Sequence, residues 1–238
     1  MVTPILPLTL SQVQVIKQGK RILGPLDYKL SGRGITVVLG PNGSGKTTFL
    51  RTMHGLEHIR AGRLYWACTT LAARKSQAFV FQTPILLRRT VLDNIAYPLL
   101  VDGSTKATAY ARAQEIAERI GLGGLLGVMG TAISGGEKQK LALARALVRK
   151  PQVLFLDEPC ANLDGSATKD IEAILMDEKA NGTRLIMSTH NVAQARRLAD
   201  DVVFLYRGLL HDQGPSATFF TTPATSEALT FLNGGILA

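Results

Sequence analysis

Cysteine is scarce in this sequence, which has only Cys68 and Cys160 among 238 residues. Two cysteines cannot build a disulfide framework, which excludes the small disulfide-stapled secreted class and favours a reducing compartment. Long apolar runs are also missing, because none approaches the roughly 18 residues that a membrane span needs. No basic N-terminal region followed by a cleavage site is present either. We therefore expect the chain to stay in the cytoplasm.

Acidic residues are fewer than basic ones. The chain has 18 Asp and Glu and 27 Lys and Arg, which give a formal net charge of +9. This balance suits nucleic acid, an anionic membrane face or anionic ligands, and a diffusely solvated basic surface is the simpler alternative. Hydrophobic residues make up 46% of the chain, which is enough for a sizeable core. Composition alone does not choose among these partners.

A glycine-rich loop is the most informative stretch that is present. It matches G-x-x-x-x-G-K-[ST], follows the apolar run Ile35–Leu39 and opens into the helical pattern Thr48–Met53. Glycines let backbone N–H groups converge on phosphate, and the helix N-terminus adds positive partial charge. We expect Lys46 to reach the β- and γ-phosphates and the Thr47 hydroxyl to ligate Mg²⁺. The predicted nucleotide-binding residues here are Gly40, Pro41, Asn42, Gly43, Ser44, Gly45, Lys46, Thr47 and Thr48.

Strand-like runs alternate with helical stretches along the chain, which predicts an α/β fold with a mainly parallel sheet. Residues 83–150 show only helical patterns and are expected to form an inserted helical subdomain. Residues 8–82 and 151–238 would form the nucleotide-binding core, so that 8–238 is a single domain. The predicted strands are Ile35–Leu39, Ala78–Phe81, Val153–Leu156, Arg184–Ser188 and Val202–Leu205, and the predicted helices include Thr90–Tyr97, Thr105–Ile120, Glu137–Arg149 and Ser226–Leu232.

Two carboxylates follow the buried strand Val153–Leu156. Strand alternation points Asp157 and Glu158 in different directions at the end of the strand where ligands of such sheets bind. Asp157 would hold Mg²⁺ through its water shell, and Glu158 would polarise the attacking water. The alternative is a pair of solvated acids in a turn.

Ser134-Gly135-Gly136 stands at the entrance of a predicted helix. Ser134 fits an N-cap, and the two glycines expose backbone N–H groups to an anion. Ser134 and Glu137 also have the spacing of a capping box, so that the stretch is open to a purely structural interpretation.

These elements together resemble the ATP-binding cassette ATPases. The phosphate loop, Gln82, Ser134-Gly135-Gly136, the Asp157-Glu158 strand end, Ala161–Asp164 and Ser188-Thr189-His190 occur in the order and approximate spacing of that family. The resemblance implies a phosphate-loop fold with an N-terminal antiparallel β portion, and ATP and Mg²⁺ as cofactors. It also implies a homodimer in which each ATP lies between the phosphate loop of one copy and Ser134, Gly135 and Gly136 of the other.

The resemblance assigns roles to three further residues. Gln82 would touch Mg²⁺ and the attacking water and couple them to a partner subunit, although it would otherwise be taken for a surface amide. Asp164 would cross the dimer interface, cap a helix, or do both. His190 would contact the γ-phosphate and position water; the alternative is that it has a purely structural role. Lys46, Glu158, Gln82 and His190 are thus the expected catalytic residues.

The sequence departs from the family pattern at three places. Glu137 stands where the family usually has Gln, and we expect the capping box to turn its carboxylate toward its own helix. No aromatic residue precedes the phosphate loop at the adenine-stacking position, so adenine contact would be looser or would come from Ile16, Lys17 or Gln18. Cys160 stands where the family usually has a hydroxyl residue. It is either a small buried thiol or a reactive one.

Some segments are similar to the ATPase subunits of prokaryotic tungstate and related oxyanion importers, namely Phe81–Val91, Ala161–Thr168 and His190–Asp200. That resemblance implies permease subunits in the membrane, an extracytoplasmic binding protein, a position on the inner membrane face and no nucleic acid. The alternative is a cassette ATPase that moves no solute, such as an iron–sulfur assembly ATPase. A nucleotide kinase fails because it has no use for Ser134-Gly135-Gly136 together with Glu158.

Overall fold

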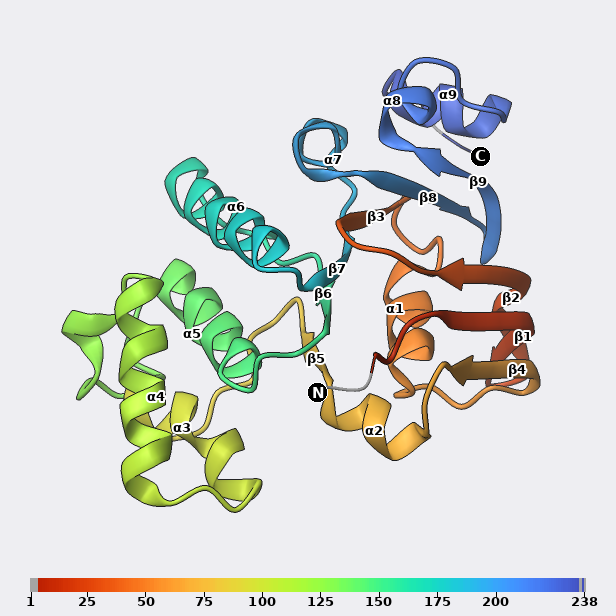
Figure 1. Ribbon diagram of the computed structural model, residues 1–238. Coiled ribbons are helices and arrows are strands. Elements are labelled where there is room, and N and C mark those ends of the chain that lie inside the picture. The colour runs from red at the N-terminus through yellow and green to blue at the C-terminus, as the bar shows by residue number, and fades with distance from the viewer. Residues whose placement is uncertain (1–3, 236, 238) are drawn as a thin grey trace.

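Two sheets organise the chain, and the computed structural model describes residues 4–235 and 237. Six strands form one sheet in the order β5-β6-β7-β3-β8-β9, and three form a second sheet in the order β2-β1-β4 (Figure 1). The first five strands of the larger sheet are parallel, and β9 is antiparallel to β8. The strands are β1 (Leu8–Lys17), β2 (Lys20–Leu30), β3 (Ile35–Leu39), β4 (Ala61–Trp66), β5 (Gln77–Val80), β6 (Val153–Asp157), β7 (Arg184–Ser188), β8 (Asp201–Tyr206) and β9 (Leu209–Pro215).

The central strands have the sequences that such a sheet requires. Strands β3, β6 and β7 are buried at all five of their residues, because helices or the second sheet cover both faces. This confirms the predicted α/β fold with a mainly parallel sheet. The β3 and β7 bounds coincide with the predicted runs, and β5 begins one residue earlier, at Gln77.

Helix α1 lies between the two sheets and places the phosphate loop at their junction (Figure 1). Its buried Phe49, Leu50 and Met53 pack with residues of both sheets in one hydrophobic core. A second core covers the opposite face of the larger sheet. The helices are α1 (Lys46–His54), α2 (Thr70–Lys75), α3 (Val91–Val101), α4 (Lys106–Arg119), the short 3₁₀ turn η1 (Gly123–Leu125), α5 (Gly135–Leu147), α6 (Gly165–Ala180), α7 (Val192–Leu198), α8 (Ser216–Phe219) and α9 (Ser226–Leu232).

The three helices α3, α4 and α5 begin at hydroxyl N-caps, Thr90, Thr105 and Ser134, whose side chains accept a bond from the first-turn backbone. Helix α3 continues past the predicted end at Tyr97 to Val101, although Pro98 lies within it and lacks an N–H. The apolar residues after the proline, including Leu99 and Leu100, pack against the core and sustain the extra turn.

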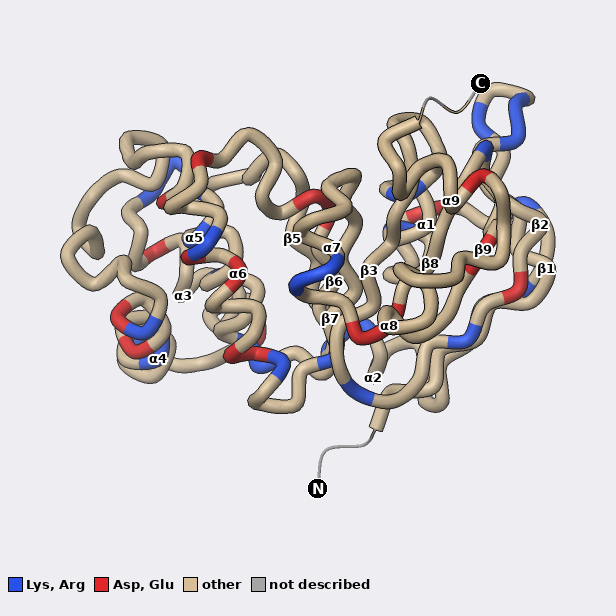
Figure 2. Tube along the Cα trace, turned by 90° about the horizontal axis from the view of Figure 1, so that it is seen from above, with Lys and Arg blue, Asp and Glu red and all other residues tan. Residues whose placement is uncertain are grey.

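The smaller sheet confirms the expected N-terminal antiparallel portion, because β1 pairs antiparallel with both β2 and β4. Lys and Arg are scattered over the molecule and interspersed with Asp and Glu (Figure 2). None of the described helices combines the length and the apolarity that crossing a membrane requires.

A partly buried histidine, His54, lies at the end of helix α1 and packs against the larger sheet. The His54 imidazole meets the rings of Phe79 and Phe155 edge-on, with ring centroids 5.5 and 5.6 Å away. Among the described residues its buried Nδ1 has no hydrogen-bond partner. Burial, and then the positive charge of Arg74, lowers the pKa of His54 to about 4. The imidazole is therefore neutral in the folded protein at ordinary pH.

Because the pKa of His54 is lowered in the folded protein, we expect the free energy of unfolding to depend on pH. Below pH 6.5 the unfolded chain protonates His54, whereas the folded chain resists protonation until about pH 4. The free energy of unfolding should therefore fall as pH drops through this window, by up to about 3 kcal/mol. Urea unfolding of wild type and His54→Phe between pH 7 and 4 measures it, with the exposed His58→Gln as the control. An equal slope in wild type and His54→Phe would contradict the prediction.

Candidate active site

The phosphate loop turns tightly because glycine occupies its constrained positions. Gly40 has a φ of 152°, and a Cβ there would lie 2.2 Å from the Leu205 carbonyl oxygen and 2.6 Å from Ser44 Oγ. Gly45 has a φ of 101° and is the N-cap of α1. Both conformations are costly for any residue with a side chain. The loop backbone can therefore approach a ligand closely.

The N-terminus of α1 offers a site for an anion. Gly45 carries no side chain to cap the helix, so the first N–H groups of α1 are free to face phosphate. Ser44 is 2% exposed, and its hydroxyl has no hydrogen-bond partner among the described residues. A buried hydroxyl without a partner beside a glycine cradle fits a triphosphate that supplies the acceptor.

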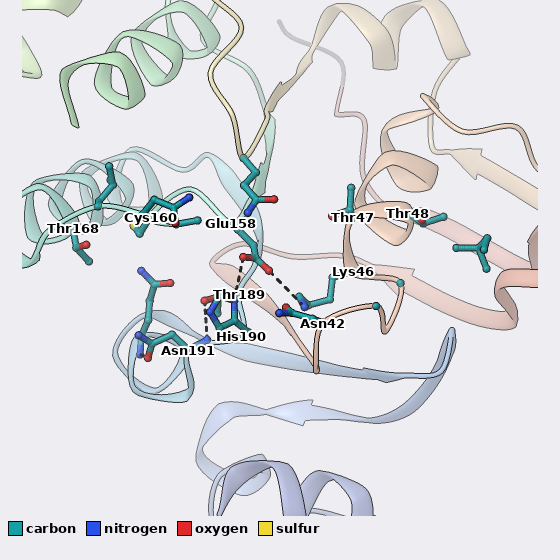
Figure 3. Close-up of a pocket in the computed structure, with 18 residues that line it drawn as sticks. Asn42, Lys46, Thr47, Thr48, Glu158, Cys160, Thr168, Thr189, His190 and Asn191 are labelled. Carbon is teal, nitrogen blue, oxygen red and sulfur yellow. Dashed lines mark hydrogen bonds and ion pairs between the residues drawn. The ribbon is translucent and has the colours of Figure 1, made fainter. Parts of the chain in front are cut away.

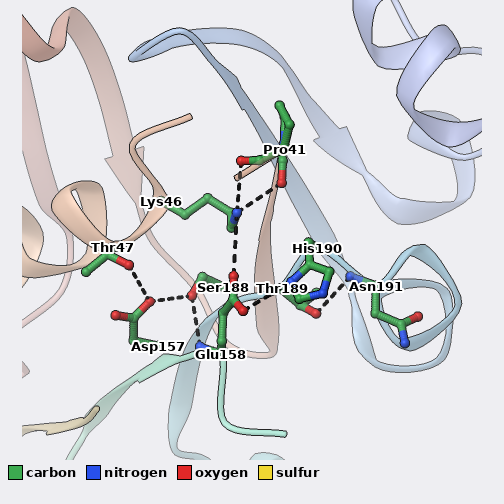
Figure 4. A network of polar contacts seen from close by, with 10 residues as sticks. Pro41, Lys46, Thr47, Asp157, Glu158, Ser188, Thr189, His190 and Asn191 are labelled. Atoms are coloured by element: carbon green, nitrogen blue, oxygen red, sulfur yellow. Dashed lines mark hydrogen bonds and ion pairs between the residues drawn. The ribbon is translucent and has the colours of Figure 1, made fainter. Parts of the chain in front are cut away.

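Lys46 is the buried cation of this loop. Its ammonium donates to the carbonyl oxygens of Gly40 and Pro41 at 3.0 and 3.1 Å and lies 3.5 Å from Glu158 Oε1 (Figure 4). Burial lowers the pKa of Lys46, and the nearby Glu158 opposes that shift. The ammonium thus stands between the phosphate loop and the strand-end carboxylate, where it can bind phosphate oxygens.

Asp157 and Glu158 point to different neighbours, as strand alternation predicted. Asp157 is 2% exposed, and its Oδ1 accepts hydrogen bonds from Thr47 Oγ1 at 2.9 Å and from Ser188 Oγ at 2.8 Å (Figure 4). A hydroxyl and a carboxylate oxygen are ligands that Mg²⁺ prefers. The described residues contain no cluster of three His, Cys, Asp or Glu side chains that would hold a metal. The adjacent Thr47 hydroxyl and Asp157 carboxylate fit a Mg²⁺ ion that would draw its other ligands from phosphate and water.

Glu158 faces the cavity instead. Its Oε2 lies 3.1 Å from Nδ1 of His190, and its Oε1 faces Lys46. The backbone of Glu158 has a φ of 45°, which is uncommon for a non-glycine residue. Such strained backbone conformations cluster at functional sites. Its backbone N–H donates to Ser188 Oγ at 3.0 Å, so Ser188 holds both acidic residues in place. Sequence reasoning did not identify this bridging role of Ser188, since only contact geometry reveals it.

A cavity of about 690 Å³ brings these groups together (Figure 3). It joins the phosphate loop to the carboxyl ends of β6 and β7, and it includes Gln82 and His190 among its walls. The predicted site residues that line it are Asn42, Gly43, Gly45, Lys46, Thr47, Thr48, Gln82, Glu158 and His190.

Ser134, Gly135 and Gly136 are not among the residues that line this cavity. They lie at the start of α5, where the predicted capping box is confirmed. Glu137 Oε2 accepts from the backbone N–H and the hydroxyl of Ser134 at 2.8 and 2.7 Å, and these bonds lower the pKa of Glu137. The carboxylate is thus directed to its own helix, as expected.

Two other predicted features have clear outcomes. Asp164 is the N-cap of α6, with Oδ1 accepting from the Ala167 N–H at 2.8 Å. Cys160 lines the cavity, and burial raises the pKa of its thiol to about 11. Because the thiolate is the reactive form, this cysteine is a poor nucleophile at neutral pH. Of the two interpretations this favours an unreactive thiol, although Cys160 is only partly buried.

A parallel sheet, a glycine loop opening into a helix, a buried lysine and two strand-end carboxylates define a phosphate-loop nucleoside triphosphatase. The profile of the ABC transporter family matches residues 23–161. The chain belongs to this family, and it is an ABC ATPase that hydrolyses ATP.

Known proteins with similar sequences span several transport systems. The tungstate uptake system ATP-binding protein TupC of Peptoclostridium acidaminophilum is 36% identical over 204 residues, which cover 84% of this chain and 95% of that protein. The nickel import ATP-binding protein NikO of Rhodobacter capsulatus is 37% identical over 242 residues, covering 94% and 95%. An ATP-binding cassette of an ABC transporter, solved in its ADP conformation, has the same fold. It has a TM-score of 0.82 at 20% identity, covering 96% of this chain and 99% of that one.

Proposed function

We propose that this chain is the ATP-hydrolysing subunit of an importer for a small solute, and that the solute is an oxyanion, tungstate before molybdate, sulfate or phosphate. The placement of Lys46, Glu158 and His190 around one cavity is the observation that supports hydrolysis there. The segments Phe81–Val91, Ala161–Thr168 and His190–Asp200, together with the tungstate uptake relative, support the oxyanion. The nickel import relative shows that the family serves other solutes too.

The contacts in the cavity support a separate role for each residue in ATP binding and hydrolysis. Lys46 and the N–H groups of the loop bind the β- and γ-phosphates, while Thr47, Asp157 and Gln82 hold Mg²⁺, which neutralises phosphate charge when bound. Glu158 then takes a proton from the attacking water, and His190, 3.1 Å from its carboxylate, orients that water. The buried Lys46 sits in a low-dielectric site, which strengthens its attraction for developing negative charge.

A second copy would complete the site. Ser134, Gly135 and Gly136 lie outside the cavity of their own chain, and Asp164 begins the neighbouring helix α6, so these residues are available to a partner's ATP. We assign residues 83–150 to a helical subdomain that presents this stretch, and 8–82 with 151–238 to the nucleotide-binding core. Closure of the homodimer over two ATP molecules would drive two membrane permease subunits.

In this proposal the chain sits on the inner membrane face, and a periplasmic or extracellular binding protein delivers the solute through the permease. The other function to consider is an ABC ATPase without transport, such as an iron–sulfur assembly ATPase. Genes for a polytopic permease and a binding protein beside this one would favour transport, and assembly genes would favour the alternative.

Reconstitution tests the solute directly. With the permease partners in proteoliposomes, tungstate-loaded binding protein should raise the ATPase rate several-fold, because solute recognition lies in the binding protein and permease. Unloaded binding protein and protein presented with sugars or amino acids are the controls. Stimulation by an amino acid would reject the oxyanion assignment and leave the ATPase assignment intact.

A further inference from the structure

Ser188 is the last residue of strand β7, and its hydroxyl lies between the two acidic residues of the site (Figure 4). Strands β6 and β7 pair in parallel with Asp157 opposite Ser188, so the sheet itself brings the hydroxyl beside the acidic pair. Ser188 is fully buried, with an exposed fraction of 0%. A serine hydroxyl has one proton to donate and lone pairs that accept, and a buried one needs partners within the protein.

The proton of this hydroxyl goes to the residue that is expected to hold Mg²⁺. Ser188 Oγ donates to Asp157 Oδ1 at 2.8 Å, and Thr47 Oγ1 donates to the same oxygen at 2.9 Å. No hydrogen bond from the described residues reaches the other carboxylate oxygen, Oδ2 of Asp157. The two donors restrain the carboxylate and leave Oδ2 and the lone pairs of Thr47 for the metal and its water shell.

The lone pairs of the same hydroxyl hold the residue that is expected to act on water. The Glu158 N–H donates to Ser188 Oγ at 3.0 Å. The φ of 45° at Glu158 persists only where the surroundings enforce it, and this bond is made at the strained backbone itself. The side chain that starts from this backbone reaches Lys46 and His190. Ser188 therefore acts on the direction of the Glu158 carboxylate without touching it.

We propose that Ser188 is a positioning residue for both halves of the reaction, because it orients Asp157 toward Mg²⁺ and Glu158 toward the attacking water. The inference rests on the proposed roles of these two carboxylates. A group that donates on one side and accepts on the other is required, since the Asp157 carboxylate only accepts and the Glu158 N–H only donates. Metal affinity and water activation thus depend on one side chain that binds neither the metal nor the water.

Binding of Mn²⁺ to the full chain in saturating ADP tests the metal half without hydrolysis, because electron paramagnetic resonance measures the free ion. We expect Ser188→Ala to raise the Kd for Mn²⁺ about tenfold, as is typical when a metal-binding carboxylate loses an orienting partner. The affinity for ADP in EDTA should stay the same, since Ser188 does not contact the phosphate loop. Ser188→Thr, which keeps the hydroxyl, should restore the Mn²⁺ affinity.

Single-turnover hydrolysis at saturating metal tests the water half. Ser188→Ala should slow the chemical step by about 10- to 100-fold, with the ATP concentration for half-maximal rate unchanged. Adding Ser188→Ala to Glu158→Gln should slow it less than about twofold further, because the carboxylate through which the hydroxyl acts is already gone. The Mn²⁺ defect should persist in the double variant, since that effect passes through Asp157.

Thr36→Val is the matched control, because Thr36 is another fully buried hydroxyl residue of the same sheet. It lies near the amino end of β3, and its Oγ1 accepts from Arg184 at 2.6 Å. This variant should lower the unfolding temperature and leave Mn²⁺ affinity and the chemical step as in wild type. Ser188→Cys fills nearly the same volume with a weak donor and acceptor, so it should share the defects of Ser188→Ala and covers the case in which that variant unfolds.

Wild-type Mn²⁺ affinity in Ser188→Ala and Ser188→Cys would overturn the positioning role. So would equal slowing of the chemical step by Ser188→Ala with and without the Glu158 carboxylate. Failure of the ADP-bound wild type to bind Mn²⁺ would instead count against the metal site at Thr47 and Asp157 itself.

Discussion

Replacing Lys46 with alanine should lower kcat for ATP hydrolysis by at least about 10³-fold and weaken ATP binding strongly. The lysine is 6% exposed and is the charge positioned between the loop carbonyls and Glu158. Its charge-assisted bonds to the β- and γ-phosphates have no substitute in the variant, and the Glu158 carboxylate is left to repel the nucleotide. Equilibrium binding of a fluorescent ATP analogue and single-turnover hydrolysis measure the two effects separately.

Lys75→Ala provides the control, since Lys75 is an exposed lysine at the end of α2. Thermal unfolding of both variants checks that the fold is retained. Turnover close to that of wild type in Lys46→Ala would remove the central assignment of this site.

Glu158→Gln should preserve ATP binding and slow hydrolysis by about 10²–10⁴-fold or more. Glutamine keeps the size and packing of the side chain and removes the group that accepts the proton of water. It also removes the negative charge 3.5 Å from the Lys46 ammonium, which leaves the lysine free for phosphate. Glu172→Gln is a matched control, because Glu172 has a similarly buried side chain, 12% exposed against 13%, and pairs with Arg197.

In the same variant, uncleaved ATP should hold two copies together. We expect Glu158→Gln to elute as a dimer in size-exclusion chromatography with ATP and low Mg²⁺, and as a monomer with ADP, because two chains of net charge +9 gain little by meeting without nucleotide. Adding Ser134→Arg should abolish the dimer by filling the trans phosphate site. A monomer under every condition, or a dimer indifferent to Ser134→Arg, would contradict the proposed closure.

Much of the larger sheet could be predicted, because its central strands are continuous apolar runs bounded by turn residues. Strand β9 was missed, since its residues Leu209–Pro215 mix apolar, charged and turn-forming types and its pairing at the sheet edge leaves most of it only partly buried. The end of α3 was wrong because tertiary packing of Leu99 and Leu100 outweighs the local effect of Pro98.

The parts of the site that could be predicted are those in which the functional residues lie together in one short stretch of the sequence. The phosphate loop and the strand-end carboxylates meet as expected, because carboxyl ends of parallel strands share one edge of the sheet. The bridging role of Ser188 could not be assigned, since its partners Asp157 and Glu158 lie far away in the sequence.

The position of Ser134 at the start of α5, apart from the cavity that holds Lys46, has a genetic consequence. In the proposed dimer each composite site takes one of these residues from each copy. A Lys46→Ala chain and a Ser134→Arg chain would each be inactive alone. In a mixed dimer of the two, one site would combine the intact Lys46 of the second chain with the intact Ser134 of the first. Co-expression of the two defective alleles should then restore growth that depends on the transporter, which is intragenic complementation between recessive lesions.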